Sequence, residues 1–577
     1  MAGRAGMEWW REGREKVRNG KQEEDGRLGK GAVTGTNARL SSQCANQSLS
    51  SRHANRELSS RYADRDLPSR HANPNLPHDR LNSGSMTAQS HANGNTPHTD
   101  YPQHAKSDSA GGSAGGSNTA RTSSNTTRTS SNTARTSDTT FTLGHELGEI
   151  TDPSSATPEG TKGAVHGRTG VIHTPHGDIE TPAFIPVATK ATVKTLTPDQ
   201  IRDTGAQAIL SNAYHLYLQP GPDIVDEAGG VSAFENWHGP TYTDSGGFQV
   251  MSLGVGFKKV LAMDTAGLAE KDIRARSKDR MAHVDEDGVD FRSVIDGSKH
   301  RFTPEVSMQI QHQLGADIIF AFDELTTLVD TRQYQEQSVE RTHRWAKRCL
   351  DEHDRLTNLR THRPLQSLWG VVQGAQYEDL RRQAARGLVE ISDQAEAAGR
   401  RGFGGFGIGG ALEKENLGTI VGWVCDELPK EKPRHLLGIS EPDDLFTAIA
   451  AGADTFDCVA PTRLGRRGGV YTLDGRMNLT GARFKRDFTP VDAEVGGYVS
   501  ENFTRAYIHH LLKAKEFLAG TLCTMHNLHF MIRLVDNIRE AMKEGRFEEY
   551  RAEFMSRYYG PDWADRVVPT NFIDGVR

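Results

Sequence analysis

An aspartate and three arginines stand close together near residue 460. The segment 452–469, GADTFDCVAPTRLGRRGG, carries an apolar run that ends at Asp457 and is followed by Arg463, Arg466 and Arg467 among glycines. Guanidinium groups bind phosphate oxygens through paired hydrogen bonds. The spacing therefore predicts a carboxylate that acts beside a bound phosphodiester, although a single aspartate at the end of a strand is also typical of a helix cap or a turn.

Four other apolar runs also end in polar residues or glycines. In a barrel of parallel strands the carboxyl ends share one rim, where catalytic residues gather. Five strands that end in this way therefore predict one polar pocket at that rim. The residues are Asp244, Ser245, Gly246, Gly247 and Gln249 after one run, Asp323 and Glu324 after the second, Gln373 and Gly374 after the third, and Gly409 and Gly410 after the fourth.

Two of these carboxylates, Asp244 and Asp457, form a pair suited to glycosyl chemistry. In such a pair one carboxylate attacks an anomeric carbon and the other transfers the proton of the leaving group. Asp323, Gln373 and the backbone of Gly409–Gly410 offer donors and acceptors for a flat heterocycle. The residues therefore predict cleavage of a glycosidic bond at a base within a phosphodiester chain. A barrel glycosidase that acts on sugars would explain the two acids but not the arginine loop.

From about residue 163, short apolar runs alternate with amphipathic helical ones. Such alternation is typical of parallel strands joined by crossover helices. The predicted fold class is therefore α/β, a (β/α)8 TIM barrel with insertions. An open, doubly wound sheet is the alternative, but no G-x-G-x-x-G motif follows a strand to support a nucleotide site. The expected strands cover residues 206–216, 316–325, 367–375, 405–412, 434–440 and 452–460, and the expected helices cover residues 303–315, 338–356, 378–392 and 441–452.

Three helix starts are marked by a proline that follows Thr or Glu and precedes an acidic residue. Proline is favoured in the first turn of a helix because its missing N–H would have no partner there. The pattern predicts helices that begin near Pro198, Pro304 and Pro442.

The first 162 residues differ in composition from the rest. They contain imperfect repeats such as SRHANREL and SRYADRDL, a second set such as ARTSSNT and TRTSSNT, and the segment SAGGSAGGS between the two sets. Such sequence buries too little apolar surface to offset the entropy of ordering. Residues 1–162 are therefore predicted to form a disordered low-complexity extension, and residues 163–577 the barrel. The scattered arginines would give RNA only a weak, salt-sensitive attraction, and a solvated tail is the simpler interpretation.

Composition limits the class of protein. A formal charge of −6 and a pI near 6.5 mean that any basic surface is local. The five cysteines are scattered, which favours a reducing compartment over a disulfide framework. No apolar run is long enough to span a bilayer, and the N-terminus lacks the apolar region of a secretory signal. The expected location is the cytoplasm, with no membrane association.

Several segments together resemble the bacterial tRNA-guanine transglycosylases (queuine tRNA-ribosyltransferases). They include TDSGGFQVMSL, VVQGA, GIGGAL, LLGISEPDDL and DTFDCVAPTRLGRRGG, and the resemblance runs from about Arg168 to the C-terminal region. It implies a (β/α)8 barrel with insertions. It also implies an exchange of the wobble guanine of G-U-N anticodon tRNAs for a 7-deazaguanine base. Members of the family are usually homodimers, so a homodimer is the expected oligomeric state.

The resemblance also implies roles for individual residues. Asp457 matches the nucleophile that attacks ribose C1′, and Asp244 matches the general acid/base. The positions that match base-binding residues are Asp323, Gln373 and Gly410, with Ser245, Gly246, Gly247 and Phe248 around the same pocket. The positions that match anticodon-loop contacts are Gly438, Ile439, Ser440, Glu441, Pro442, Asp443 and Asp444, and Thr462, Arg463, Leu464, Gly465 and Arg466.

The sequence departs from the family at its structural zinc site. The resemblance implies three cysteine ligands, but these positions hold Val495, Gly497 and Ser500, and only His526 keeps the residue type of a ligand. Structural zinc needs four nitrogen or sulfur ligands. The sequence therefore predicts no zinc, with His526 as a packed helical histidine and residues 485–530 as a remnant of the zinc subdomain. The missing ligands leave open the alternative of a catalytically silent tRNA-binding paralogue or partner subunit.

Two insertions and two changes near the base pocket complete the departures. About 25 residues are added near 254–285 and around ten near 393–402. The first insertion is basic and would extend the RNA surface or form a solvated helix. Leu325 and the stretch ALEKE after Gly410 differ from most bacterial members. The incoming base is therefore left open between queuine and 7-aminomethyl-7-deazaguanine.

Overall fold

Eight parallel strands close into a barrel. The computed structural model describes residues 139–147, 166–253, 282–328, 330–410 and 414–566, all within one unit, Ser123–Arg577. The strand order is β10-β11-β12-β13-β14-β4-β5-β6, with β6 paired back to β10. This closure confirms the predicted (β/α)8 barrel and excludes the open sheet. The strands are β4 (Ala183–Ala188), β5 (Ile209–Ser211), β6 (Thr241–Thr243), β10 (Ile318–Phe320), β11 (Ser367–Val372), β12 (Gly405–Ile408), β13 (Arg434–Leu436) and β14 (Thr455–Cys458).

The barrel strands are buried on both faces, as expected of parallel strands covered by helices. β11, for example, is buried at every position of SLWGVV. The inner core is filled by large side chains that include Tyr242, Phe320 and Trp369, and a separate cluster lies between the strands and the outer helices. The barrel interior is thus a packed core, and room for chemistry exists only at its ends.

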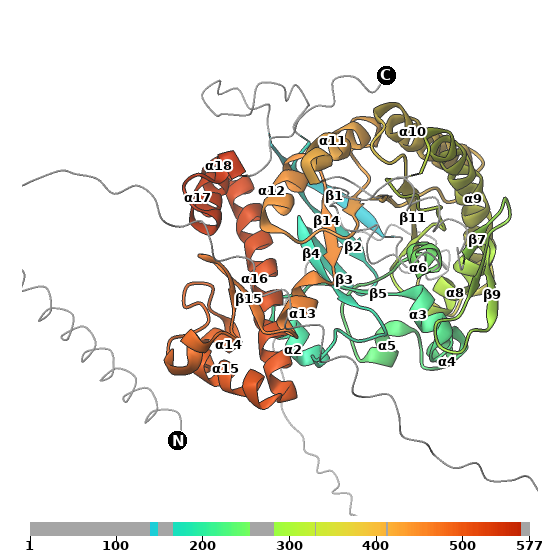
Figure 1. Cartoon of the computed structure of the whole chain (residues 1–577). Coiled ribbons are helices and arrows are strands. Elements are labelled where there is room, and N and C mark those ends of the chain that lie inside the picture. Colours follow the sequence, from blue (N-terminus) through green and yellow to red (C-terminus); the bar gives the residue numbers. More distant parts are fainter. Residues whose placement is uncertain (1–138, 148–165, 254–281, 329, 411–413, 567–577) are drawn as a thin grey trace, which may run out of the picture. The chain divides into compact units, whose positions relative to one another are not determined.

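Helices connect the strands and surround them (Figure 1). Thr197 and Thr303 cap α2 and α8 by accepting the backbone N–H of Gln200 and Val306, and the three predicted proline starts are confirmed. The helices are α2 (Pro198–Asp203), α3 (Ala213–Leu218), α4 (Pro222–Glu227), α5 (Val231–Glu235), α6 (Gly247–Leu253), α8 (Pro304–Leu314), α9 (Arg332–Leu359), α10 (Glu378–Ala397), α11 (Leu417–Glu427), α12 (Pro442–Ala450) and α13 (Ala460–Gly465), with the 3-10 turn η3 (Lys414–Asn416).

One part of the predicted disordered extension forms a strand. β1 (Thr140–Glu146) pairs antiparallel with β2 (Arg168–Thr174), which pairs with β3 (Gly177–Thr181). The prediction was wrong for these residues because TFTLGHE alternates apolar and polar side chains and can pair with the edge of β2. The Phe141 ring also lies 4.9 Å from the guanidinium carbon of Arg168. The rest of the predicted extension lies outside the described residues.

A buried ion pair joins this sheet to the amino end of the barrel. Arg168 on β2 donates to both carboxylate oxygens of Asp454 at 2.9 and 2.8 Å, and both side chains are almost fully buried. Asp454 also accepts the backbone N–H of Arg434 at 2.7 Å. The Asp454 carboxylate thereby fixes the start of β13 and the start of β14, the strand that carries Asp457.

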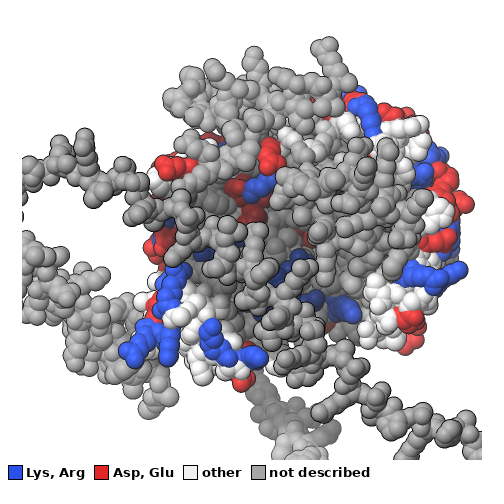
Figure 2. Space-filling model, viewed as in Figure 1, with Lys and Arg blue, Asp and Glu red and all other residues white. Residues whose placement is uncertain are grey.

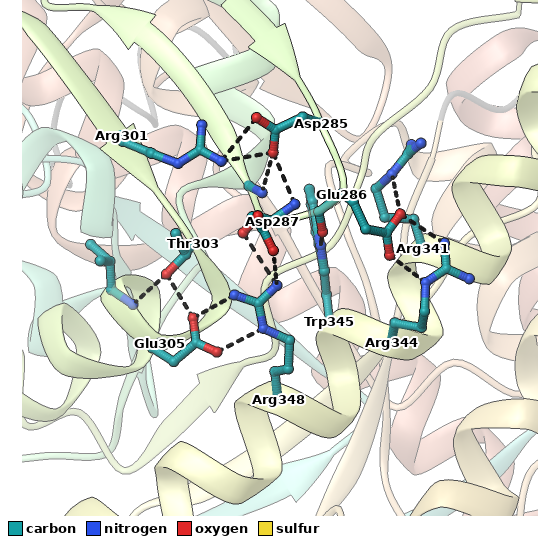
Figure 3. Close-up of polar contacts among 12 residues, drawn as sticks. Asp285, Glu286, Asp287, Arg301, Thr303, Glu305, Arg341, Arg344, Trp345 and Arg348 are labelled. Carbon is teal, nitrogen blue, oxygen red and sulfur yellow. Dashed lines mark hydrogen bonds and ion pairs between the residues drawn. The ribbon is translucent and has the colours of Figure 1, made fainter.

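A small sheet packs beside α8 and α9 through a network of charges. It consists of β7 (Ala282–Val284), β8 (Val289–Arg292) and β9 (Lys299–Phe302). Figure 3 shows arginines of α9 pointing at the turn between β7 and β8, where Arg344 and Arg341 contact Glu286. Arg348 binds both oxygens of Glu305 at 2.7 Å. Exposed ion pairs contribute little to stability, and the sheet also buries Val289, Phe291 and Phe302 in the core. Residues 254–281 of the predicted insertion lie outside the described residues.

The C-terminal part is organised around one long helix, α16. Figure 1 shows α16 between the barrel and α14 and α15. Asn527 of α16 accepts the backbone N–H of Tyr471 and donates to the carbonyls of Pro461 and Gly469, which ties α13 and β15 together. The elements are β15 (Gly469–Thr472), β16 (Gly475–Asn478), η4 (Ala482–Arg486), α14 (Gly497–Asn502), α15 (Arg505–Ala514), α16 (Phe517–Lys543), α17 (Phe547–Tyr559) and α18 (Trp563–Arg566). Among the described helices, none has the length and apolar character to cross a membrane.

Candidate active site

The residues predicted to act in catalysis and base binding lie at the carboxyl ends of five barrel strands. Asp457 belongs to β14, and Asp244, Asp323, Gln373 and Gly410 follow β6, β10, β11 and β12. Parallel strands in a closed barrel bring these ends to one rim. Direct contacts link part of the set, because Ser245 and Gln373 both donate to Asp323.

Asp244 is held by the residues that follow the neighbouring strand β5. Its Oδ1 accepts the backbone N–H of Ala213 at 2.8 Å, and its Oδ2 accepts from the Asn212 amide. Burial raises the pKa of Asp244 to about 7, and the negative charge of Asp457 acts in the same direction, against the hydrogen bonds from the Ala213 and Gly246 amides. The two carboxylates are therefore within electrostatic reach, and Asp244 exchanges its proton near neutral pH.

Asp457 has a different environment. Its Oδ1 accepts from His435 Nε2 and from the backbone N–H of Gly438, each at 3.2 Å, and the side chain is 15% exposed. The rim therefore carries two carboxylates: Asp457, bound by two donors at Oδ1, and Asp244, bound at both oxygens and with its pKa raised by burial.

A buried polar pair lies beside these acids. Gln373 Nε2 donates to Asp323 Oδ2 at 2.6 Å, and Ser245 Oγ donates to Oδ1 at 3.1 Å. Burial raises the pKa of Asp323 to about 6. Among the described residues, Gln373 Oε1 has no hydrogen-bond partner although it is buried. A buried acceptor without a partner is suited to take an N–H of a ligand.

The position of Asp323 is fixed by contacts of the following residue, Glu324, with α9. Glu324 is almost fully buried, and its carboxylate accepts from Tyr334 at 2.6 Å and pairs with Arg341 of α9. The same arginine contacts Glu286 in the network of Figure 3. The carboxyl end of β10 is thus fixed by α9.

Gly410 takes a conformation that favours glycine. Its φ is 95°, and a Cβ there would lie 2.8 Å from Arg381 Nη2 and 3.0 Å from Gln373 Oε1. Arg381 is fully buried and donates to the carbonyls of Val372, Ala375 and Gly409. This arginine joins the ends of β11 and β12, and the absence of a side chain at 410 keeps the space above Gln373 open.

The segment after β6 turns into α6. Gly246 has a φ of 79°, and Gly247 lies so close to the Asp323 carbonyl that a Cβ would approach it to 2.9 Å. Phe248, in the first turn of α6, is 43% exposed. The two glycines thus bring the start of α6 against the Asp323 loop.

The acidic side chains of the predicted anticodon-contact segment 438–444 face protein groups. Glu441 pairs with Arg476, and Asp443 and Asp444 contact Lys414 Nζ at 2.7 and 3.2 Å. Tyr559 also donates to Asp443 at 2.7 Å. Burial raises the pKa of Asp444 to about 7. Ile439, Ser440 and Pro442 are buried as well, whereas Gly438 is exposed.

The second predicted contact segment, 462–466, contributes few surface groups. Thr462 and Gly465 are buried, and a Cβ on Gly465 would lie 2.7 Å from the Thr524 amide of α16. Leu464 and Arg466 are half-buried, and Arg463 is exposed. The close approach of α13 to α16 therefore leaves arginines as the part of this segment that reaches solvent.

Two lysines that the sequence analysis missed join these arginines. Lys194 has its pKa lowered by partial burial and by the positive charges of Arg466, Arg463 and Lys190. Lys190 and Lys194 belong to the loop after β4, and their position at the end of an apolar run was the available signal. Figure 2 shows basic side chains gathered in the lower left of the face, over the region where Figure 1 has α13 and α15. The rim therefore has a basic border suited to phosphates.

The residues at the expected zinc positions form a hydrogen-bonded cluster. His526 Nε2 donates to the Tyr471 carbonyl at 2.7 Å, and Ser500 Oγ lies 3.4 Å from Nδ1. Burial lowers the pKa of His526 to about 4. Val495 is half-buried, and a Cβ on Gly497 would lie 2.5 Å from the His529 ring. This donor set, with no thiolate, does not fit tetrahedral zinc, and no group of three metal-binding side chains occurs among the described residues.

Comparison with known proteins identifies the family of this chain. The sequence model of the family described as Queuine tRNA-ribosyltransferase matches residues 164–560. The chain belongs to the queuine tRNA-ribosyltransferase family. This membership confirms the resemblance found in the sequence and makes the protein an enzyme, a pentosyltransferase.

Curated relatives named queuine tRNA-ribosyltransferase match about two thirds of this chain. The relative from Halothermothrix orenii is 45% identical over 382 residues, which cover 66% of this chain and 91% of the relative. The relative from Fusobacterium nucleatum is 43% identical over 384 residues, 66% of this chain and 92% of the relative. The relative from Bacillus subtilis is 42% identical over 382 residues, 66% of this chain and 89% of the relative.

Proposed function

We propose that this family member is a tRNA-guanine transglycosylase of queuosine modification. It exchanges the wobble guanine of G-U-N anticodon tRNAs for queuine or 7-aminomethyl-7-deazaguanine. The observation that carries the proposal is the pair of unlike carboxylates at one rim. One oxygen of Asp457 accepts two hydrogen bonds, whereas Asp244 accepts at both oxygens and burial raises its pKa to about 7.

In the first half of the reaction Asp457 acts as the nucleophile. One carboxylate oxygen forms a bond to ribose C1′ while the C1′–N9 bond breaks, and the electron pair leaves with guanine. Asp244 in its protonated form gives its proton to the departing base. The product of this half is free guanine and an ester between Asp457 and the tRNA.

In the second half the roles reverse. The ionised Asp244 takes the N9 proton of the incoming 7-deazaguanine, and the N9 electron pair attacks C1′ and displaces the Asp457 carboxylate. A pKa of about 7 suits this cycle, because Asp244 must lose and regain a proton near neutral pH. Asp323, Gln373 and Gly410 bind the base, and the unpartnered Gln373 Oε1 supports that role.

Base exchange by the purified full chain tests the proposal. Radiolabelled guanine is offered with a G-U-N anticodon tRNA, and unlabelled queuine or 7-aminomethyl-7-deazaguanine is added in competition. Incorporation is expected, and the stronger competitor identifies the physiological base. Binding of tRNA without incorporation would instead indicate a silent tRNA-binding subunit.

The arginines after Asp457 are expected to bind the phosphates of the anticodon loop. Arg463 and Arg467 are both exposed, and replacing either by Gln should weaken tRNA binding about threefold to tenfold. The slope of the logarithm of the binding constant against the logarithm of salt concentration should become shallower by about one, the loss of one phosphate contact. Fluorescence anisotropy at several salt concentrations measures both quantities. Arg546→Gln, at an exposed arginine paired with Glu544, is the matched control. An unchanged salt slope in both variants would refute this role.

We propose that the enzyme works without zinc. Metal analysis of protein grown with zinc should find much less than one equivalent, and a chelator should change neither the melting temperature nor base exchange. His526→Gln keeps a donor for the Tyr471 carbonyl, so exchange should stay within about threefold of the native chain. Stoichiometric zinc that is lost in this variant would overturn the proposal.

The remaining assignments are proposals of the same kind. The exposed rings of Tyr498 and Tyr507, which both pack against the half-buried Phe503, support a second copy of this chain as partner, and sedimentation equilibrium would detect the homodimer. Residues 163–577 are proposed as the catalytic unit, with 485–530 as the remnant of the zinc subdomain. The tRNA substrate favours a cytoplasmic location.

A further inference from the structure

A buried histidine lies directly beneath Asp457. His435 is the middle residue of β13, and its side chain is completely buried. Its Nε2 is 3.2 Å from Asp457 Oδ1, and its Nδ1 is 2.8 Å from Thr455 Oγ1. A polar ring in the interior of a barrel needs partners, and both of its nitrogens have one.

The surroundings of the ring fix its orientation and its tautomer. The Tyr242 and Phe320 rings lie 5.6 and 5.4 Å from it, so it is packed within the inner apolar core. A carboxylate can only accept, so Nε2 carries the hydrogen that is donated to Asp457. In the neutral imidazole Nδ1 then accepts from the Thr455 hydroxyl.

The hydrogen bonds select one oxygen of Asp457. His435, in the middle of β13, and the amide of Gly438, in the loop after β13, both donate to Oδ1. The described residues direct no such pair of donors at Oδ2. A carboxylate held in this way has a fixed rotamer, and Oδ2 keeps its lone pairs for a bond to carbon.

We propose that His435 is the positioning residue of the nucleophile, with its second nitrogen bonded to Thr455. It keeps Oδ2 of Asp457 toward ribose C1′, and its N–H stabilises the carboxylate whenever the bond to C1′ breaks. No proton is transferred, and His435 does not touch the substrate. This inference rests on the proposed transglycosylase reaction and adds to it a residue that the reaction requires for rate and not for tRNA binding.

Two substitutions at His435 and one neighbouring control test the inference. His435→Phe keeps a ring but lacks the N–H, so kcat for base exchange should fall about 10- to 100-fold while KM for tRNA stays within about twofold. His435→Gln offers an N–H near the position of Nε2 and should recover a large part of the rate. Phe320→Leu disturbs the packing of the same ring but leaves both hydrogen bonds, so it should lower the melting temperature with kcat within about threefold.

The outcomes separate this inference from the proposed function. A His435→Phe variant with native kcat would overturn the inference. It would also be overturned if His435→Gln and Phe320→Leu lost kcat equally, in proportion to their loss of melting temperature. If the native chain itself exchanges no guanine, the proposed function fails, and this inference fails with it. Native exchange together with a selective kcat loss in His435→Phe and recovery in His435→Gln is the result expected.

Discussion

Asp457→Ala is expected to lower base exchange by at least about 10⁴-fold, because the nucleophile of a covalent mechanism has no substitute in the site. Binding of tRNA should stay within about threefold, since the basic border of the rim is left intact. Incorporation of labelled guanine measures the first quantity, and fluorescence anisotropy with labelled tRNA measures the second.

A surface aspartate provides the matched control for this variant. Asp474 lies in the turn between β15 and β16, its side chain is 77% exposed, and it pairs with Arg557. Asp474→Ala should exchange guanine at the native rate. If Asp457→Ala keeps more than a small fraction of native exchange, then Asp457 does not form the bond to ribose and the mechanism is wrong.

Asp244→Asn is expected to lower base exchange by about 10²- to 10⁴-fold, the usual contribution of a positioned acid or base. The amide has nearly the same shape but can neither give a proton to guanine nor take one from the incoming base. A pH series of the native chain supplies a second readout, because a carboxyl with a pKa of about 7 changes state within the working range. Native-like exchange in Asp244→Asn would contradict the role.

The same substitution has a pH-dependent effect on stability. Burial raises the pKa of folded Asp244 to about 7, above the value of about 3.9 in unfolded chains. Between these values the folded state holds a proton that the unfolded state releases, so the free energy of unfolding falls as the pH rises. Asp244→Asn removes this loss. The melting temperature of the variant relative to the native chain should therefore be higher at pH 8 than at pH 5.

Much of the fold could be predicted from local patterns. Proline-marked starts such as Pro304 favour a helix, and a short apolar run that ends at a glycine, such as the one that forms β11, favours a buried strand. The expected strand 206–216 was too long, because only Ile209–Ser211 forms β5 and Asn212 then caps α3 by accepting the N–H of His215. An apolar run does not by itself distinguish a strand from a buried helix.

The sequence predicted the two acids of the site but not the residues that form hydrogen bonds to them. Asp244 and Asp457 stood out because they belong to a set of five apolar runs that all end in polar residues or glycines. Asn212 and His435 gave weaker signals, since either residue type fits a cap or a core position. Their roles depend on contacts across the barrel between segments far apart in sequence, which no local pattern encodes. The inward direction of Asp443 and Asp444 likewise depends on Lys414 and Tyr559.

Isolation of the covalent intermediate tests the central claim most directly. The full chain is mixed with a G-U-N anticodon tRNA without added base, denatured at mildly acidic pH and digested, and the peptide that carries the RNA is identified by mass spectrometry. The account predicts one ribose ester, on Asp457, that disappears when 7-deazaguanine base is added before denaturation. An ester on another residue, or exchange of guanine with no protein-bound RNA at any time, would contradict it.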